Sequence, residues 1–143
     1  MPRLGEAIPV LQVRDVVASV AFYAQRLGFT ARYQEDGFAI VGRDATQLHL
    51  TQANDDTWRE RSSLAQRPVV SGAESFLPGT DSCRIRVDDV DQLYTEYEVQ
   101  GVIHPAGPLK DEWWGDRHFG VLDLDGNLLT FFQRRERNTD SPA

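Results

Sequence analysis

The motif VRDV at residues 13–16 returns, with one change, as VDDV at residues 87–90, 74 positions later. A short stretch with strand-like alternation precedes each copy, and apolar residues spaced three and four apart follow it. The aspartates of the two copies, Asp15 and Asp89, are residues that commonly cap the N-terminus of a helix. This repetition predicts that the chain contains two copies of one structural unit.

Each copy of the repeat predicts a strand, a helix and three further strands, which is a tandem βαβββ pair in the α+β class. The helices are expected to end at Gly28 and Gly101, because glycine readily takes the left-handed backbone that closes a helix. With an offset of 81, Asp44 of the first copy falls on Asp125 of the second, and His49 falls on Thr130. The predicted strands cover residues 8–13, 29–34, 38–43 and 46–52, and then 82–87, 102–104, 118–123 and 127–133.

The predicted modules span about residues 7–52 and 81–133, joined by a connector at 53–80 within a single domain. A connection of this length is uncommon in a compact domain and is usually functional or mobile. We expect a mobile connector that includes a short helix at residues 57–65. Trp58 and Phe76 are expected to attach it to the body of the protein.

Composition narrows the class of protein. A chain of 143 residues with 41% hydrophobic content is long enough for one globular domain with a core, and its net charge of −7 disfavours nucleic acid as a partner. The single cysteine, Cys83, excludes an internal disulfide and a multi-cysteine zinc site. No signal peptide and no membrane-spanning run is recognisable, so we expect a soluble cytoplasmic protein whose acidic surface suits a cationic small molecule.

The hairpin LDLDGNLLTFFQ at residues 122–133 bears on whether the protein is an enzyme or a binding protein. Alternation along its second strand places Thr130 on the same side as Leu128 and Phe132. Thr130 is therefore either an ordinary strand residue or the occupant of a position where a related protein keeps a metal ligand. The choice separates a binding protein from an enzyme.

Four stretches of the sequence carry a resemblance to a known superfamily. They are AIPVLQVRDVVASVAFYAQRLGF, FAIVGRDATQLHL, VDDVDQLYTEY and WGDRHFGVLDLDGNLLTFF. Together they resemble the vicinal-oxygen-chelate superfamily of glyoxalases, extradiol dioxygenases and antibiotic-resistance proteins, and within it the bleomycin resistance proteins. The resemblance implies a curved mixed sheet around a cleft, and a homodimer whose N-terminal strand crosses to the partner to form two grooves.

The resemblance also identifies four positions where metal-dependent members carry ligands, one on the first and one on the last strand of each module. These positions hold Ile8, His49, Ser82 and Thr130 in this chain. A catalytic divalent metal normally needs about three protein ligands, and only His49 is a usual one. We therefore expect no metal, no cofactor and no enzymatic activity.

Aromatic residues are the main candidates for ligand contact. Phe38 follows a turn at a hairpin exit, where resistance proteins carry an aromatic that stacks on the flat bithiazole of the drug; by its pattern alone it could equally be core. Trp114 resembles the Trp-Gly motif of the family and is assigned to the ligand groove. Its neighbour Trp113 could line the groove or plug one end of the barrel.

Polar residues complete the candidate site. His49 either exchanges a hydrogen bond with the ligand or is satisfied by a neighbouring side chain. Asp36 and Glu112 could attract the cationic tail of a bleomycin-type drug. We therefore predict metal-independent binding and sequestration of bleomycin-like glycopeptide antibiotics. The alternatives are a metal-dependent enzyme of the same superfamily with a shifted ligand set, or a binder of another aromatic small molecule.

Overall fold

The computed structural model describes residues 1–53, 66 and 78–135. Its first module begins with β1, and the parallel partner of β1 is β4, so the first sheet has the order β1-β4-β3-β2. Asp15 caps the helix through its side chain, which accepts a hydrogen bond from the backbone N–H of Ala18. The elements are β1 (Val10–Val13), α1 (Val16–Arg26), β2 (Thr30–Glu35), β3 (Phe38–Arg43) and β4 (Thr46–Gln52).

The second module repeats this topology, with the strand order β5-β8-β7-β6. Asp89 caps its helix by accepting from the backbone N–H of Gln92, and Gly101 ends the helix with a φ of 70°. The elements are β5 (Ser82–Arg86), α3 (Val90–Gln100), β6 (Lys110–Asp111), β7 (Asp116–Leu122) and β8 (Leu128–Arg134). The predicted fold class is confirmed: two four-stranded mixed sheets, each with one helix.

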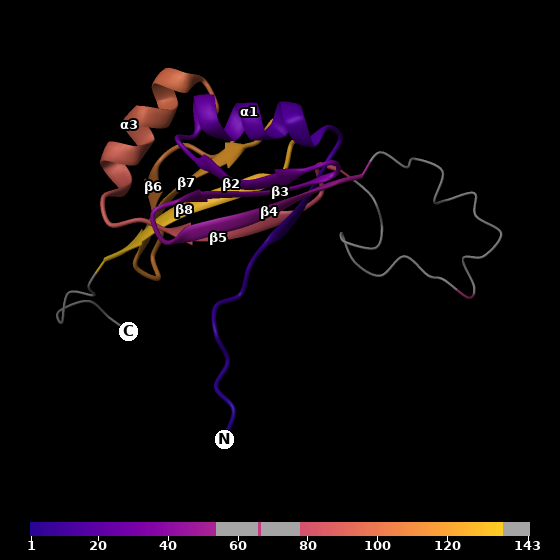
Figure 1. The fold of residues 1–143 in the computed structure, drawn as a ribbon. Helices are drawn as coiled ribbons and strands as arrows, with labels where there is room; N and C mark the ends of the chain where they lie inside the picture. Colours follow the sequence, from indigo (N-terminus) through magenta and orange to yellow (C-terminus); the bar gives the residue numbers. More distant parts are fainter. Residues whose placement is uncertain (54–65, 67–77, 136–143) are drawn as a thin grey trace.

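Each sheet buries the face that packs against its helix. Leu48 and Leu50 of β4 are fully buried against α1, and Phe119 of β7 and Phe131 of β8 are buried with α3. Both helices lie on the same side of the strands (Figure 1). No helix among the described residues is long and apolar enough to cross a membrane.

Several predicted strand boundaries differ from the structure by one or two residues, and β7 begins at Asp116 instead of His118; a proline explains two of the differences. The first strand begins at Val10 instead of Ile8, because Pro9 has no N–H to donate to the ladder. The strand predicted at 102–104 reduces to one bridge between Ile103 and Val121, because Pro105 starts a turn. The edge of the second sheet is instead the short β6. The short helix predicted at 57–65, and the residues Trp58 and Phe76, lie outside the described residues.

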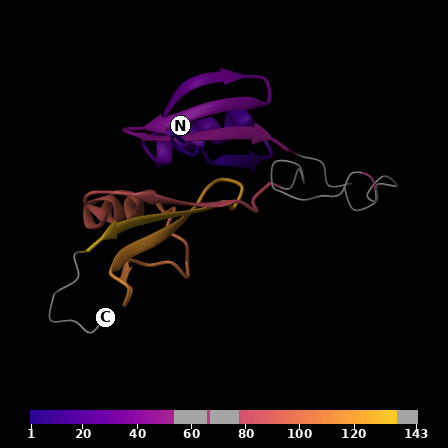
Figure 2. The same ribbon diagram turned by 90° about the horizontal axis from the view of Figure 1, so that it is seen from below.

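The two modules lie side by side, as seen from below in Figure 2, and two seams join them. At the first seam, the buried Tyr23 hydroxyl donates to Asp123 at 2.9 Å, and the backbone N–H of Arg14 donates to Asp125 at 2.9 Å. At the second seam, the Tyr97 hydroxyl donates to the Leu27 carbonyl at 2.6 Å. The seams are equivalent under the repeat, yet they use different partners.

Candidate ligand-binding site

The predicted site residues lie on or beside the face of each sheet that points away from its helix. We call these the first open face and the second open face. Because side chains alternate along a strand, the residues that share a face follow from the strand register. The first open face carries Val10, Phe38, Ile40, His49 and Thr51, and the second carries Arg84, Arg86, His118, Thr130 and Phe132.

The first open face brings Phe38 and His49 together. Their ring centroids are 5.1 Å apart in an edge-to-face arrangement, and the ring of Tyr33 lies 6.1 Å from that of Phe38. Both Phe38 and His49 are half-buried, so neither belongs to the core. Among the described residues, the buried Nε2 atom of His49 has no hydrogen-bond partner, so no neighbouring side chain satisfies that nitrogen. A planar group with a polar edge could bind here.

Asp36 lies beside this face, in the turn between β2 and β3. Gly37 takes a φ of 76° there, and such a left-handed turn suits glycine. The Asp36 side chain is exposed, and no hydrogen bond or ion pair reaches it from the described part of the chain. Its charge is available to a cation.

The second open face is flanked by the two tryptophans. Trp114 is 42% exposed and lies nearly parallel to His118, with 6.5 Å between ring centroids and 28° between planes. Trp113 is 83% exposed and meets Trp114 edge to face at 5.7 Å. The alternative in which Trp113 plugs a barrel end was therefore wrong. Both rings offer surface to a ligand.

Glu112 holds His118 beneath this aromatic pair. Its Oε1 atom lies 3.2 Å from Nε2 of His118 and 2.8 Å from Nζ of Lys110. Hydrogen bonding to Lys110, and then to His118, holds the pKa of Glu112 below its ordinary value. The carboxylate is therefore charged at neutral pH.

Sequence reasoning missed an ionic group on this face. Arg84 pairs with the buried carboxylate of Asp116, and its guanidinium carbon lies 4.4 Å from the ring centroid of Phe132. The Trp114 side chain, followed by Arg84, keeps the pKa of Asp116 below its ordinary value by stabilising the carboxylate. The signal that could have found Arg84 and His118 is the alternation that places them with Thr130 and Phe132.

The six predicted residues form two separate groups. Phe38 and His49, with Asp36 beside them, belong to the first module, while Glu112, Trp113 and Trp114 belong to the second. No ring contact, hydrogen bond or ion pair joins the two groups within the described residues. A single ligand molecule could contact both groups of residues only if the two groups lined the same groove.

The donor set does not fit a divalent metal. Of the four positions that correspond to superfamily ligands, Ile8 and Thr130 have no carboxylate, imidazole or thiolate, and neither does Ser82. The register places Val10 beside His49 and Arg84 beside Thr130, so their strand neighbours are not ligands either. Across the part of the chain that the structure describes, no group of three or more His, Cys, Asp or Glu residues could hold a metal.

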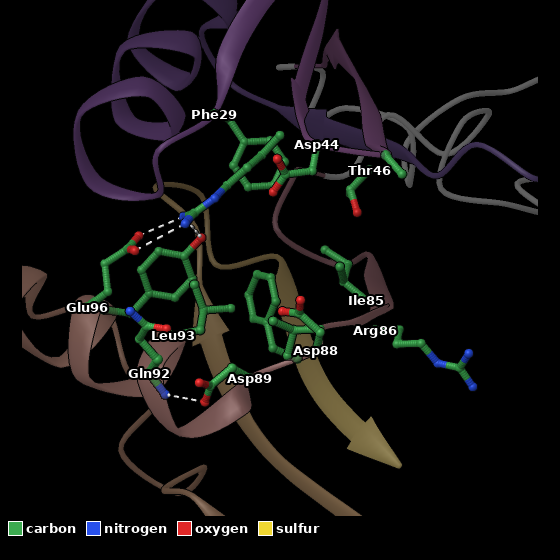
Figure 3. A pocket seen from close by; sticks show the side chains of 15 residues that line it. Phe29, Asp44, Thr46, Ile85, Arg86, Asp88, Asp89, Gln92, Leu93 and Glu96 are labelled. Atoms are coloured by element: carbon green, nitrogen blue, oxygen red, sulfur yellow. Dashed lines mark hydrogen bonds and ion pairs between the residues drawn. The ribbon is translucent and has the colours of Figure 1, made fainter.

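A cavity of about 430 Å³ lies elsewhere, at the second seam. It is enclosed by the β3–β4 turn, the end of β5 and the first turns of α3 (Figure 3). None of the six predicted site residues lines it. The cavity is therefore distinct from the predicted site residues, although Arg86 of the second open face borders it.

Sequence comparison relates this chain to known proteins over most of its length. Residues 7–131 match the profile of the Glyoxalase/Bleomycin resistance protein/Dioxygenase superfamily. The chain is 46% identical over 129 residues to a curated bleomycin resistance protein from Geobacillus stearothermophilus, covering 90% of this chain and 96% of that protein.

Solved structures show the same architecture. The bleomycin-binding protein of bleomycin-producing Streptomyces verticillus, complexed with copper(II)-bleomycin, is 26% identical with a TM-score of 0.68 and covers 96% of this chain and 100% of that chain. The bleomycin resistance determinant encoded on transposon Tn5 is 24% identical with a TM-score of 0.67, covering 93% of this chain and 100% of that chain. The latter likeness supports the fold alone.

Proposed function

Because this chain belongs to the Glyoxalase/Bleomycin resistance protein/Dioxygenase superfamily, we propose that it binds and sequesters bleomycin-like glycopeptide antibiotics, without a metal and without catalysing a reaction. The identity of 46% to a curated bleomycin resistance protein supports this choice of ligand. Sequestration needs only affinity and a stable complex, so it requires no nucleophile or general base.

The observation that carries the proposal is the half-exposed ring of Trp114 beside His118, flanked by the carboxylates of Glu112 and Asp116. An aromatic face can stack on a planar heteroaromatic group, which contributes about 0.5–1.5 kcal/mol beyond the burial of area. Glu112 and Asp116 are already paired with Lys110 and Arg84, so the carboxylate that would attract a cationic tail is the exposed Asp36. This is the combination that a bleomycin-type drug offers.

The proposed binding unit is a homodimer. The first and second open faces lie on different modules, and a second copy could bring the Phe38 side of one subunit opposite the Trp114 side of the other. Residues 1–7 are exposed along their whole length, with the apolar Leu4 fully exposed, as expected of a segment that crosses to a partner. Sedimentation velocity should then give a dimer, and removal of residues 1–8 should weaken it.

The function is tested by calorimetric titration of chelator-treated protein with copper-loaded and metal-free bleomycin. The expected result is submicromolar binding of one drug molecule per chain, unchanged by the chelator. Absence of heat at several temperatures would exclude bleomycin as the ligand. A near-stoichiometric metal in protein purified without chelator would contradict the metal-independent part of the proposal.

A further inference from the structure

We propose that the cavity at the second seam is a binding site for a small organic cation, an amidinium, guanidinium or ammonium group carried on an aromatic or aliphatic body. The positive group would lie between the carboxylates of Asp44 and Asp88, and the apolar body against the walls of the cavity. This site includes none of the six predicted drug-contact residues and does not depend on bleomycin binding.

The first argument comes from the repeat itself. The two alignments that relate the modules place Arg14 on Asp88 and Asp125 on Asp44. At the first seam, Nη1 of Arg14 lies 3.4 Å from Oδ1 of Asp125, which also accepts the backbone N–H of Arg14. One seam therefore carries a guanidinium on its carboxylate, and the equivalent pair at the other seam is two acids.

The second argument is that these two acids lack partners. Asp44, from the β3–β4 turn, and Asp88, just before α3, border the cavity from opposite sides (Figure 3). No hydrogen bond or ion pair reaches either carboxylate from the described residues. The guanidinium that balances the first seam has no counterpart here, and a cation from solution would supply it.

The other charged groups of the cavity are already engaged or turned away. Arg43 donates to both carboxylate oxygens of Glu96, at 2.6 and 3.1 Å, and to the Leu27 carbonyl at 2.9 Å. The side chain of Arg86 points away from the cavity (Figure 3), and the Asp89 carboxylate caps α3. The two free carboxylates therefore dominate the local charge.

The third argument concerns size and the character of the walls. The cavity volume of about 430 Å³ falls within the range of roughly 300–1,000 Å³ that is usual for small-molecule sites. Its walls include the buried apolar side chains of Phe29, Ile85, Leu93 and Phe131. A bare metal ion would make no favourable contact with these apolar side chains. A ring with one cationic substituent would pack against them while its charge lies beside Asp44 and Asp88.

The test uses benzamidine as the probe, with the neutral isostere benzamide and calcium chloride as comparisons, on the ¹⁵N-labelled full chain. Benzamidine should shift the backbone signals of Thr46, Val87 and Leu93, and the other two compounds should not. Equal shifts with benzamide would overturn the cationic assignment. Shifts at these residues with calcium would assign the site to an inorganic cation instead and overturn the proposal.

Substitutions then locate the site. The double substitution Asp44→Asn with Asp88→Asn should weaken benzamidine binding by about fivefold or more, since exposed charge pairs each contribute modestly. Glu98→Gln, which removes an exposed carboxylate from α3 outside the cavity, is the matched control and should change nothing. An unchanged affinity in the double variant would overturn the proposal.

A reversal of charge provides an independent readout. Asp88→Arg places a guanidinium opposite Asp44, as Arg14 lies opposite Asp125, and should abolish benzamidine binding while leaving the melting temperature equal or higher. Retained binding in this variant would contradict the site. Bleomycin affinity should be unaffected by this substitution. A failure of the cation-site proposal can therefore be distinguished from a failure of the drug-binding proposal.

Discussion

The two modules share a backbone plan, but their open faces differ in chemistry. The first presents Phe38 and His49 with the acidic residues Glu35 and Asp36 beside them, while the second presents an aromatic pair over the ionic group of Arg84 and Asp116. The β-strand register is equivalent in both, so the difference comes only from side chains. A duplicated fold can therefore supply, within the same chain, one stacking surface with acidic residues beside it and another that carries an ion pair.

The seams differ in the same way. Tyr23 and Tyr97 occupy equivalent helical positions and are both fully buried. The hydroxyl of Tyr23 donates to the carboxylate of Asp123, whereas that of Tyr97 donates to the main-chain carbonyl of Leu27. The strand register makes Arg43 the counterpart of Asp123 in the first module, and its guanidinium donates to the Tyr97 hydroxyl at 3.3 Å instead of accepting from it. The tyrosine of the first seam is therefore held by a carboxylate and that of the second by a neutral carbonyl, while the Arg43–Glu96 ion pair also crosses the second seam.

The largest loss of folding stability is expected from removing the buried carboxylate of Asp123. Asp123 accepts hydrogen bonds from Tyr23, from the backbone of Asp125 and from Asn127. Asp123→Ala leaves these buried donors without a partner and should lower the free energy of unfolding by about 3 kcal/mol. Urea denaturation measures this, with the exposed Asp91→Ala as a control expected to cost less than about 1 kcal/mol. Equal losses in the two variants would show that the Asp123 network does not hold the seam.

The two open faces can be compared by their contributions to drug affinity. Trp114→Ala and Phe38→Ala should each weaken bleomycin binding by about 1–2 kcal/mol, roughly tenfold, since truncating an aromatic anchor removes stacking and buried area. Calorimetric titration measures this, with circular dichroism as the control for folding. Affinity unchanged by Phe38→Ala but reduced by Trp114→Ala would restrict the groove to the second module.

Substituting either of the two equivalent tyrosines should lower the free energy of unfolding by a smaller amount, and the two losses can be compared directly. Tyr23→Phe should cost about 1.5–2 kcal/mol of unfolding free energy, because hydrogen bonds to a charged group are stronger, while Tyr97→Phe should cost about 1 kcal/mol. Thermal and urea unfolding of the two variants measure the difference. A reversed order would mean that Tyr97, through its additional contact with Arg43 at 3.3 Å, carries more of the second seam than its neutral bond suggests.

The smallest effect is expected in the titration of two aspartates. Burial raises the pKa of Asp123 above 3.8, while Trp114 and Arg84 lower that of Asp116. Asp116 therefore stabilises the fold above its unfolded pKa, a contribution lost as pH falls through its folded pKa. Asp123 acts in the opposite direction, because its folded form binds a proton more tightly, so its ionisation reduces stability as pH rises through the folded value.

Carboxyl-carbon NMR titration measures both aspartates in one experiment. The midpoint of Asp123 should lie above that of Asp116, and Trp114→Phe should raise the midpoint of Asp116, since it removes the indole N–H donor. A lower midpoint for Asp123 than for Asp116 would show that hydrogen bonds outweigh burial at the first seam.

Local pattern was sufficient for the superfamily, the α+β class and most elements. Capping aspartates, helix-ending glycines and strand alternation act between residues close in sequence, so the repeat of VRDV as VDDV predicted both helices and the faces of the strands. The strands predicted across Pro9 and up to Pro105 were wrong because the apolar pattern was given more weight than the missing N–H of proline.

The candidate site was predicted less completely. Pattern alone left Phe38 open between core and groove, and it could not show that Trp113 is exposed, that His49 Nε2 lacks a partner, or that Arg84 pairs with Asp116. Those facts depend on which side chains meet across strands and modules. The same is true of the seams, where equivalent residues acquired different partners.

The amino-acid sequence by itself determined the duplicated modules, the buried faces of their sheets and the absence of a usual metal ligand at three of the four superfamily positions. Only the tertiary structure decided that Trp114 stacks on His118, and that one seam is closed by Arg14 and Asp125 while the other leaves a cavity between Asp44 and Asp88. The physical reason is range: hydrogen bonding and steric preference act between chain neighbours, whereas ion pairs, stacking and cavities depend on how distant segments pack.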